Sequence, residues 1–480
     1  MEKLSHVEPK QVFHFFEEIC AIPHGSGNMN AISEYCVHFA ERRGLCFLRD
    51  AANNVVIYKN GTPGFENAEP VILQGHLDMV CQKTADTDID FETDGIDIVV
   101  DGDFIRARGT TLGADNGIAV AMILAILDSD SLAHPPLEAV FTTDEEIGMI
   151  GAGRFDTSVL KGRRMINLDA EEGDMLTVSC AGGSDMKLTL PVRKTTVRGT
   201  EIHFEICGLK GGHSGVEIDK GRVNANLLAG RLLSEAAKTT AFDIIAVNGG
   251  SKANAIPFCF DAHLITEDGE RFARRMNECF ESVKKEIGER EETCSIAVTA
   301  GRTGDFEAFD AASRDTLLYL LLLTPDGIVN MSAEIEGLVE TSLNLGVLAT
   351  ENDHVRLQYA LRSNKASALA FLEDRMRAFA SRSGCTAELS GRYLPWEYKA
   401  DSALQRLYAA CCEEDCGCSP HVTAIHAGLE CAVFAAKMED LDCIAVGPDM
   451  FGVHTVHEAL SIPSTKAIFE RICKLLAKCG

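Results

Sequence analysis

The sequence predicts an α/β domain with a largely parallel central sheet, plus an inserted α+β domain. Three observations point to this fold class. Short, continuously apolar segments alternate with helical patterns towards both ends of the chain, as in parallel sheets covered by helices on both faces. Polar residues follow these segments at their carboxyl ends, where such sheets bind ligands. Between residues 187 and 398, apolar and polar residues instead alternate, which is typical of an antiparallel sheet with one solvated face.

The two ends of the chain supply the elements of the α/β domain. Residues 9–47 are expected to be helical because their apolar residues recur at helical spacing, and a second helix is expected over 118–127, after the turn GADNG. Apolar runs predict strands at 54–60, 70–78, 137–146, 164–172 and 442–448. We therefore expect a discontinuous domain formed by residues 1–186 and 399–480.

The inserted domain is expected to span residues 187–398. Strands are predicted in its alternating segments, including SIAVTAGR and HVRLQYALRS, and helices over 222–238 and 366–380. The apolar segment 317–323 is too short to cross a membrane and is expected to be a buried helix.

Composition excludes several classes of partner. The 480 residues carry a net charge of −27, which argues against nucleic acid or an anionic membrane as the main partner. We find no apolar run of about 18 residues and no signal-peptide pattern after the first methionine, so a cytoplasmic protein is expected. The 18 cysteines should then be reduced thiols. Cys411, Cys412, Cys416 and Cys418 match no zinc-ribbon spacing and are expected to be structural or incidental thiols.

Histidines and carboxylates collect where the predicted strands end. They are His76, Asp78, Asp115, Glu145, Glu146, Asp169 and, near the end of the chain, His454 and His457. Taken singly, each has an ordinary explanation as a half-buried histidine, a helix cap or a solvated turn. Imidazole nitrogen and carboxylate oxygen are also good zinc ligands, and two ions about 3.5–4 Å apart need a carboxylate that bridges them. The shared position at strand ends favours the metal site.

Longer motifs around these residues resemble a known family. They are IPHGSGN, LQGHLDMVCQK, GTTLGADNGIAVA, TTDEEIGMIGA, HAGLEC and VGPDMFGVHTVHEAL, in this order along the chain. The sequences of these motifs are similar to those of the aminoacyl-histidine dipeptidases. These form a branch of the dizinc peptidases that include carnosinases, aminoacylases and tripeptidases. The resemblance covers nearly the whole chain. It implies a zinc-peptidase catalytic domain, with the insert as a lid and dimerisation domain.

The resemblance also implies a set of metal ligands. His76 would bind one zinc ion, Asp115 would bridge both ions, Glu146 and Asp169 would be terminal ligands, and His454 would complete the second site. Two Zn²⁺ per subunit are expected, with Co²⁺ or Mn²⁺ as possible substitutes.

Two further acids receive roles from the same resemblance. Asp78 would hydrogen-bond His76 and fix its tautomer. Glu145 would be the general base and acid that takes a proton from water and gives it to the leaving amine. The family also implies a cis peptide bond after Asp115.

One departure concerns the last motif. The family usually has Pro and Asp or Asn inside H-T-x-x-E, whereas this chain has Val456 and His457. His454 is the preferred ligand because its spacing to Glu458 fits the motif, and His457 is the alternative.

In the insert, the resemblance points to four substrate contacts. His213 would donate to the oxyanion, reaching the active site across a homodimer, Asn254 would contact the substrate, His426 would line the pocket, and Arg362 would clamp a C-terminal carboxylate. A nucleotide site is not expected, because the glycines of GTTLGADNG lack G-x-G-x-x-G spacing. We therefore expect a metallo-dipeptidase acting on small peptides, Xaa-His among them. The alternatives are an N-acyl amino acid amidohydrolase with the same metal chemistry and an inactive, peptide-binding relative.

Overall fold

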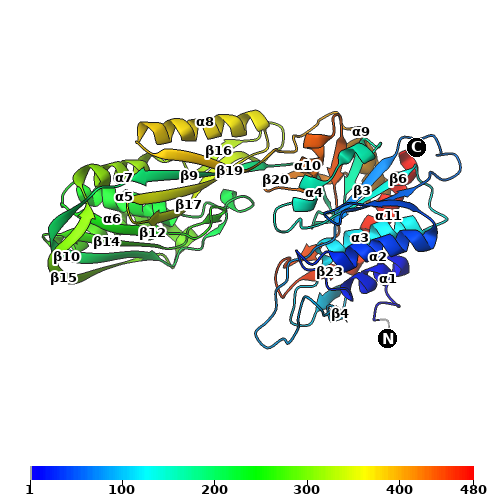
Figure 1. Ribbon diagram of the computed structural model, residues 1–480, viewed down its shortest axis with the longest axis horizontal. Helices are drawn as coiled ribbons and strands as arrows, with labels where there is room; N and C mark the ends of the chain where they lie inside the picture. The colour runs from blue at the N-terminus through cyan, green and yellow to red at the C-terminus, as the bar shows by residue number, and fades with distance from the viewer. Residues whose placement is uncertain (1–2) are drawn as a thin grey trace. The chain divides into compact units, whose positions relative to one another are not determined.

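A computed structural model describes residues 3–480, and the chain divides into two compact units (Figure 1). The first unit comprises the chain up to Cys180 together with Trp396–Ala424 and Leu429–Gly480. The second comprises Ala181–Pro395 and Ile425–Gly428. The first unit is therefore built from separate stretches of the chain.

The first unit contains an eight-stranded mixed sheet. In spatial order its strands are β1 (Cys46–Arg49), β2 (Val55–Lys59), β6 (Leu137–Thr142), β3 (Val71–His76), β7 (Arg164–Asn167), β21 (Asp442–Ala445), β8 (Met175–Cys180) and β20 (His421–Ile425). The four central strands, β6, β3, β7 and β21, run parallel, whereas β1, β2 and β8 pair in antiparallel fashion. The central strands therefore end at one edge of the sheet.

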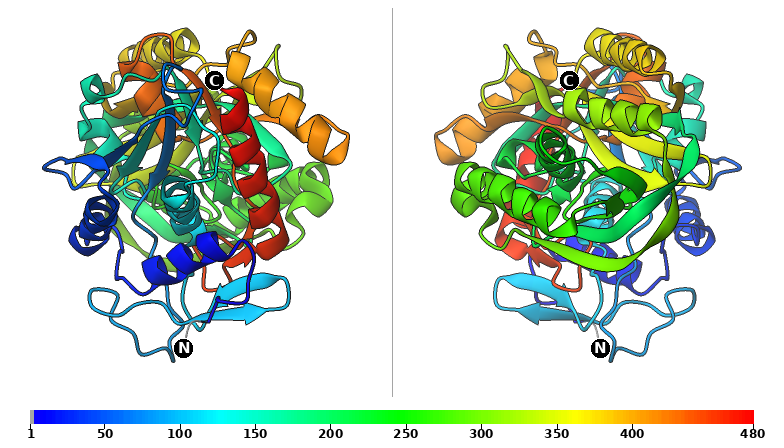
Figure 2. Two further views of the ribbon diagram at one scale, coloured as in Figure 1. Left: turned by 90° about the vertical axis from the view of Figure 1, so that its right-hand side faces the viewer. Right: turned by 90° about the vertical axis from the view of Figure 1, so that its left-hand side faces the viewer.

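The first unit also contains helices. They are α1 (Lys10–Cys20), α2 (Asn30–Arg43), α3 (Ala114–Asp128), α4 (Ile150–Arg154), α9 (Ala403–Cys416), α10 (Glu430–Lys437) and α11 (Ile462–Lys478). Helix α3 is apolar all round because it is buried against both α1 and β3. The C-terminal helix α11, red in Figure 2, packs against α9.

A smaller sheet contains the last motif of the sequence, VGPDMFGVHTVHEAL. Its strands are β22 (Met450–Phe451), β23 (Ala459–Ser461), β5 (Phe104–Ala107) and β4 (Ile98–Asp101). Strands β22 and β23 flank the turn that carries His454 and Glu458, so this hairpin determines where both side chains lie.

The second unit is built on a nine-stranded sheet whose pairs are antiparallel. Its main path is β15 (Ser295–Phe309), β10 (Lys194–Cys207), β14 (Phe260–Thr266), β12 (Asp243–Gly249), β17 (Val339–Thr350), β18 (His354–Ser363), β9 (Gly182–Pro191) and β19 (Thr386–Tyr393), with β16 (Gly327–Met331) beside β17. A two-stranded ribbon joins β11 (Gly212–His213) to β13 (Ala255–Ile256).

The helices of this unit are α5 (Ala225–Ala237), α6 (Gly269–Ile287), α7 (Ala311–Leu323) and α8 (Ala366–Arg382). Their apolar sides contribute to one core with the sheet, for example through Phe272 and Met276 of α6. On β10, Ile202 and Phe204 are buried in this core, while His203 and Glu205 lie on the opposite face. Apolar and polar residues alternate along β10, as the sequence predicted, because one face of the sheet packs on the core and the other does not.

Some expectations need correction. Residues 9–47 are not one helical region: α1 and α2 are separated by a loop with Pro23, and β1 begins at Cys46. The segment 317–323 is helical but not wholly buried, because Leu322 and Leu323 remain 56% and 52% exposed at the end of α7. None of the helices in residues 3–480 combines the length and apolar character needed to cross a membrane.

The cysteines are all unpaired in the described part of the chain. In the cluster on α9, Cys411 and Cys412 are buried, whereas Cys416 and Cys418 are exposed. The Sγ atoms of Cys416 and Cys418 lie 3.1 Å apart.

Candidate metal centre

Three parallel strands bring polar residues to one edge of the sheet. His76 is the last residue of β3, Glu146 lies in the turn after β6, and Asp169 follows β7. Because β3 lies between β6 and β7, the three chain segments emerge side by side. Asp115 joins them from the first turn of α3.

The side chains form two groups that share one carboxylate. His76, Asp115 and Asp169 each offer a ligand atom within 4.8 Å of the others, and so do Asp115, Glu146 and His454. Oδ1 of Asp115 lies 3.2 Å from Nε2 of His76, and Oδ2 lies 3.1 Å from Nε2 of His454. The two oxygens of Asp115 therefore face different groups, as those of a bridging ligand do.

The remaining contacts complete each group. Nε2 of His76 lies 3.4 Å from Oδ1 of Asp169, and Nε2 of His454 lies 2.9 Å from Oε1 of Glu146. Glu145 forms a third group of ligand atoms with His76 and Glu146. The structure thus brings together all five predicted metal ligands and the predicted base.

Asp78 connects the His76 strand to the acidic turn. Its carboxylate accepts the backbone N–H groups of Glu145 and Glu146, at 2.9 and 3.2 Å, and the hydroxyl of Ser26 at 2.8 Å. Nδ1 of His76 lies 3.0 Å from the carbonyl oxygen of Asp78 and 3.5 Å from its carboxylate. The backbone of Asp78 is therefore the nearer partner of the imidazole, and the carboxylate mainly holds the turn.

Glu458 organises the loop that carries Asp115. Its buried carboxylate accepts four backbone N–H groups, those of residues 112–115, at 2.6 to 3.4 Å. These donors precede or begin α3, where a helix has unsatisfied N–H groups and favours negative charge. In the sequence, Glu458 is recognisable only as the acid that identifies His454 as a ligand. The available signal was a carboxylate four residues after His454, within the last motif.

Asn116 is a second positioning residue that the sequence analysis missed. The peptide bond between Asp115 and Asn116 is cis, as the resemblance implied. The Asn116 side chain donates to Oδ1 of Asp169 at 2.6 Å and to the carbonyl of Leu168 at 2.9 Å. It therefore links the start of α3 to the loop after β7.

A buried polar network lies within the central strands. Oε2 of Glu430 accepts hydrogen bonds from Gln74 at 2.5 Å and from Thr142 at 2.6 Å, and Oε1 of Gln74 accepts one from Asn167 at 2.6 Å. Burial raises the pKa of Glu430 to about 7. These bonds tie β3, β6 and β7 together close to their carboxyl ends.

The charges of the site call for a cation. Burial raises the pKa of Asp169 to about 6 and that of Glu145 well above its usual range. Hydrogen bonds with Asp115 and Glu146 raise the pKa of His454 to about 11, so these carboxylates favour positive charge beside them. The oxygen and nitrogen donors suit a borderline divalent ion such as zinc. The residues present therefore fit a metal pair.

His457 does not join this cluster. Its side chain takes part in none of the metal-capable groups found in residues 3–480, and it is exposed to solvent. Its backbone carbonyl accepts a hydrogen bond from Arg106. The geometry favours His454 over His457, in line with the preferred reading of the motif.

Three of the four predicted substrate contacts interact within the second unit. Burial and the charge of Arg362 lower the pKa of both His213 and His426, the latter to about 3. Nδ1 of His213 accepts the N–H groups of Gly215 and Val216, both at 3.2 Å. For Asn254, the contact seen is made by its backbone carbonyl, which accepts the N–H of Ser214.

His426 and Arg362 have further partners. Nε2 of His426 lies 2.7 Å from the Ser342 hydroxyl, and Nδ1 lies 3.1 Å from the side-chain oxygen of Asn364. Arg362 is 9% exposed and donates to the Tyr393 hydroxyl at 3.2 Å. Its buried Nε has no hydrogen-bond partner among the described residues.

A cavity of about 690 Å³ opens next to the acidic turn of the first unit. Its walls include Ser26, Met79, Phe91, Glu146 and Ile147. It provides room for a small molecule beside one of the predicted ligands.

Comparison with known proteins identifies relatives along the whole chain. A cytosol non-specific dipeptidase from Escherichia coli is 35% identical over 480 residues, covering 99% of each chain. The crystal structure of an aminoacylhistidine dipeptidase from Vibrio alginolyticus shares 36% identity with a TM-score of 0.91, covering 99% of this chain and 98% of that one. Aminopeptidase PepT from Bacillus cereus shares the fold at 13% identity, with a TM-score of 0.56 over 98% of this chain and 99% of the other.

A match to a family as a whole covers most of the chain. Residues 72–478 fit the sequence profile described as "Peptidase family M20/M25/M40", and this range contains every residue of the candidate metal centre. The chain therefore belongs to peptidase family M20/M25/M40.

Proposed function

We propose that this protein is a cytoplasmic zinc dipeptidase that hydrolyses the peptide bond of dipeptides, aminoacyl-histidine substrates among them. The observation that carries the proposal is the position of Asp115, whose two oxygens face two separate groups of histidine and carboxylate ligands. Similarity over the full length to a non-specific dipeptidase and to an aminoacylhistidine dipeptidase supports the substrate class.

Two ions would be held by five side chains. His76 and Asp169 would bind one, Glu146 and His454 the other, and Asp115 both. When bound, such ions acidify water and polarise the scissile carbonyl. The protein's own contribution is to keep the donors in place, through Asp78 and Glu458.

Glu145 would move the proton. Its carboxylate belongs to one group of ligand atoms with His76 and Glu146 but is not needed to complete either metal site. It would accept a proton from the attacking water and pass it to the nitrogen of the leaving amine, so that the carboxylate is regenerated. Asp78 fixes the backbone of this residue and so orients the base.

We further propose that the second unit supplies substrate contacts. Because Nδ1 of His213 accepts two backbone N–H groups, the neutral ring carries its proton on Nε2, which can donate to a developing oxyanion. The unpartnered Nε of Arg362 would bind the C-terminal carboxylate of the peptide. Asn254 and His426 would contact the remainder of the substrate, and the active form would be a homodimer.

Turnover of a substrate panel tests this function. Dipeptides, including Xaa-His peptides, and N-acyl amino acids are assayed with added zinc, cobalt or manganese. We expect hydrolysis of dipeptides. Turnover of N-acyl amino acids alone would identify an amidohydrolase instead, and metal binding without turnover of either class would identify an inactive relative.

Arg362→Lys should raise KM about tenfold or more for dipeptides, because it loses the bidentate contact. An unchanged KM would remove the carboxylate clamp from the proposal.

A further inference from the structure

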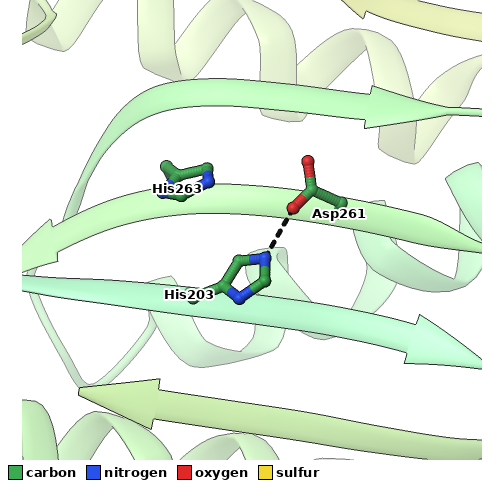
Figure 3. Close-up of side chains that lie close together, drawn as sticks. All are labelled: His203, Asp261 and His263. Carbon is green, nitrogen blue, oxygen red and sulfur yellow. Dashed lines mark hydrogen bonds and ion pairs between the residues drawn. The ribbon is translucent and has the colours of Figure 1, made fainter. Parts of the chain in front are cut away.

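A second histidine–carboxylate cluster lies on the sheet of the second unit. It consists of His203 on β10 and of Asp261 and His263 on β14, drawn in Figure 3. The two histidines are directly opposite each other on paired strands, and their rings stack with centroids 4.8 Å apart and planes inclined by 23°. One ligand atom from each of the three side chains lies within 4.8 Å of the others.

Neighbouring polar groups orient the cluster. Oδ2 of Asp261 lies 2.6 Å from Nε2 of His203, while Oδ1 of Asp261 accepts a hydrogen bond from Asn248 at 3.2 Å. Oε1 of Glu201 lies 3.2 Å from Nδ1 of His263. The Glu201 carboxylate beside Nδ1 of His263 leaves Nε2 of that ring for a metal, which is the usual arrangement around histidine ligands.

The charge around the cluster is unbalanced. Glu205 lies directly opposite Asp261 across the two strands, and like charges in that position destabilise a sheet. In the described residues, the ion pairs of Glu201, Glu205 and Asp261 are all made with His203 or His263. A bound cation would relieve the repulsion between the carboxylates without requiring both histidines to be protonated.

The cluster is also accessible. The side chains of His203, Asp261 and His263 are 36%, 39% and 41% exposed, and the residues facing β10 from the outer strand β15 are small ones, such as Ala297 and Thr299. A solvent-borne ion can therefore reach it without opening the core.

We propose that His203, Asp261 and His263 bind a divalent cation of the borderline class, Zn²⁺ first, with Glu205 as the fourth ligand. Two imidazole nitrogens select such ions over Mg²⁺ or Ca²⁺, which prefer oxygen ligands. Oε1 of Glu205 lies 3.8 Å from Nε2 of His203. A tetrahedral zinc with bonds of about 2.1 Å separates its ligand atoms by about 3.4 Å. Half-exposed side chains can make the small rotation that this requires, and the ion then links β10 to β14.

A zinc count on the intact protein tests the site independently of peptidase activity. Wild type, His263→Gln, Glu201→Gln and His354→Gln are titrated with Zn²⁺, and bound metal is measured after removal of the free ion. His354 is the matched control: it is a histidine of the same unit that lies between Glu351 and Asp353, at 2.8 and 2.9 Å, without a second histidine.

We expect His263→Gln to bind one zinc per chain fewer than wild type, and His354→Gln to bind the wild-type number. Glu201→Gln should keep the site but weaken it about 10- to 100-fold, as expected for a residue that orients a ligand. Equal counts in wild type and His263→Gln would overturn the proposal, as would the same loss in His354→Gln. Unfolding curves of the metal-free variants verify that each folds. If His263→Gln fails to fold, unweakened zinc binding by Glu201→Gln contradicts the site.

Discussion

The two histidine–carboxylate clusters of this protein use a sheet in different ways. The first lies at the ends of parallel strands, and its ligands come from loops, a helix start and a distant hairpin. The second lies on the face of an antiparallel sheet, where two neighbouring strands each place alternate residues. In the first, His76 and the three carboxylates are at most 12% exposed, and only His454 is 48% exposed, whereas in the second no ligand is less than 36% exposed.

This difference shows what a buried, catalytic arrangement requires. Strand ends leave backbone groups unpaired, so the loops there must be held by side chains such as Asp78 and Glu458. A sheet face needs no such support because its backbone is already paired. It can hold an ion, but it offers neither enclosure nor a separate base.

Replacing the proposed base should have the largest effect. Glu145→Gln is expected to lower kcat by about 10²- to 10⁴-fold, the range for loss of a general base. The metal content should be unchanged, since neither ligand group needs this residue. The matched change Glu205→Gln, in the exposed cluster, should leave kcat within about twofold. A decrease of less than tenfold in Glu145→Gln would mean that another group moves the proton.

A buried carboxyl without a cation should destabilise the second unit at high pH. Burial raises the pKa of Asp326 to about 7, although it accepts hydrogen bonds from Leu345 and Asn224. Because the folded pKa is above the usual value, this residue's contribution is fully favourable only below about pH 4 and is lost as the pH rises through 7.

Asp326→Asn should therefore be more stable than wild type above pH 7, by up to about 4 kcal/mol, with little difference near pH 4. Calorimetric unfolding at both pH values measures this. Asp374→Asn, at an exposed position of α8, is the control and should show no such pH dependence. A gain for Asp326→Asn that is equal at both pH values would rule out titration of this carboxyl as the cause.

Replacing Glu458, which holds the Asp115 loop of the first cluster, should have a smaller effect. Glu458→Gln keeps one acceptor oxygen but leaves about two buried N–H groups of residues 112–115 without a partner. We expect a loss of about 3 kcal/mol in unfolding free energy, together with weaker zinc binding. Glu470→Gln, on the exposed side of α11, should change neither quantity. Normal zinc affinity in Glu458→Gln would show that the loop holds Asp115 without this carboxylate.

The smallest effect concerns the order in which metal is released. With a graded series of zinc chelators, the ion at His203 and His263 should leave first, because its ligands are half exposed and less firmly oriented. The ions near His76 should leave last, and only their loss should lower Tm markedly and abolish turnover. Release of all metal in a single step would contradict the distinction between the two clusters.

Much of the first unit could be predicted from the sequence. Apolar runs revealed β3, β6, β7 and β21, because strands buried on both faces consist mainly of apolar residues. The positions of His76, Glu146 and Asp169 at strand ends followed from the same runs. Their individual roles did not follow from the pattern and came from the resemblance of longer motifs.

Other features were not accessible to that reasoning. An apolar run does not reveal strand direction, so the antiparallel pairing of β1, β2 and β8 remained hidden. The network around Glu430 depends on contacts between residues far apart in the chain. The pairing of His203 with His263 depends on strand register, which alternation alone does not fix.

The hairpin that carries His454 and Glu458 has a consequence for biosynthesis. Both a proposed ligand, His454, and the clamp of the Asp115 loop, Glu458, lie more than 280 residues after Asp169 in the chain. A nascent chain thus exposes His76, Asp115 and Asp169 long before their partners leave the ribosome. Complete assembly of the centre, and hence peptide cleavage, must wait until the hairpin with His454 and Glu458 has been synthesised.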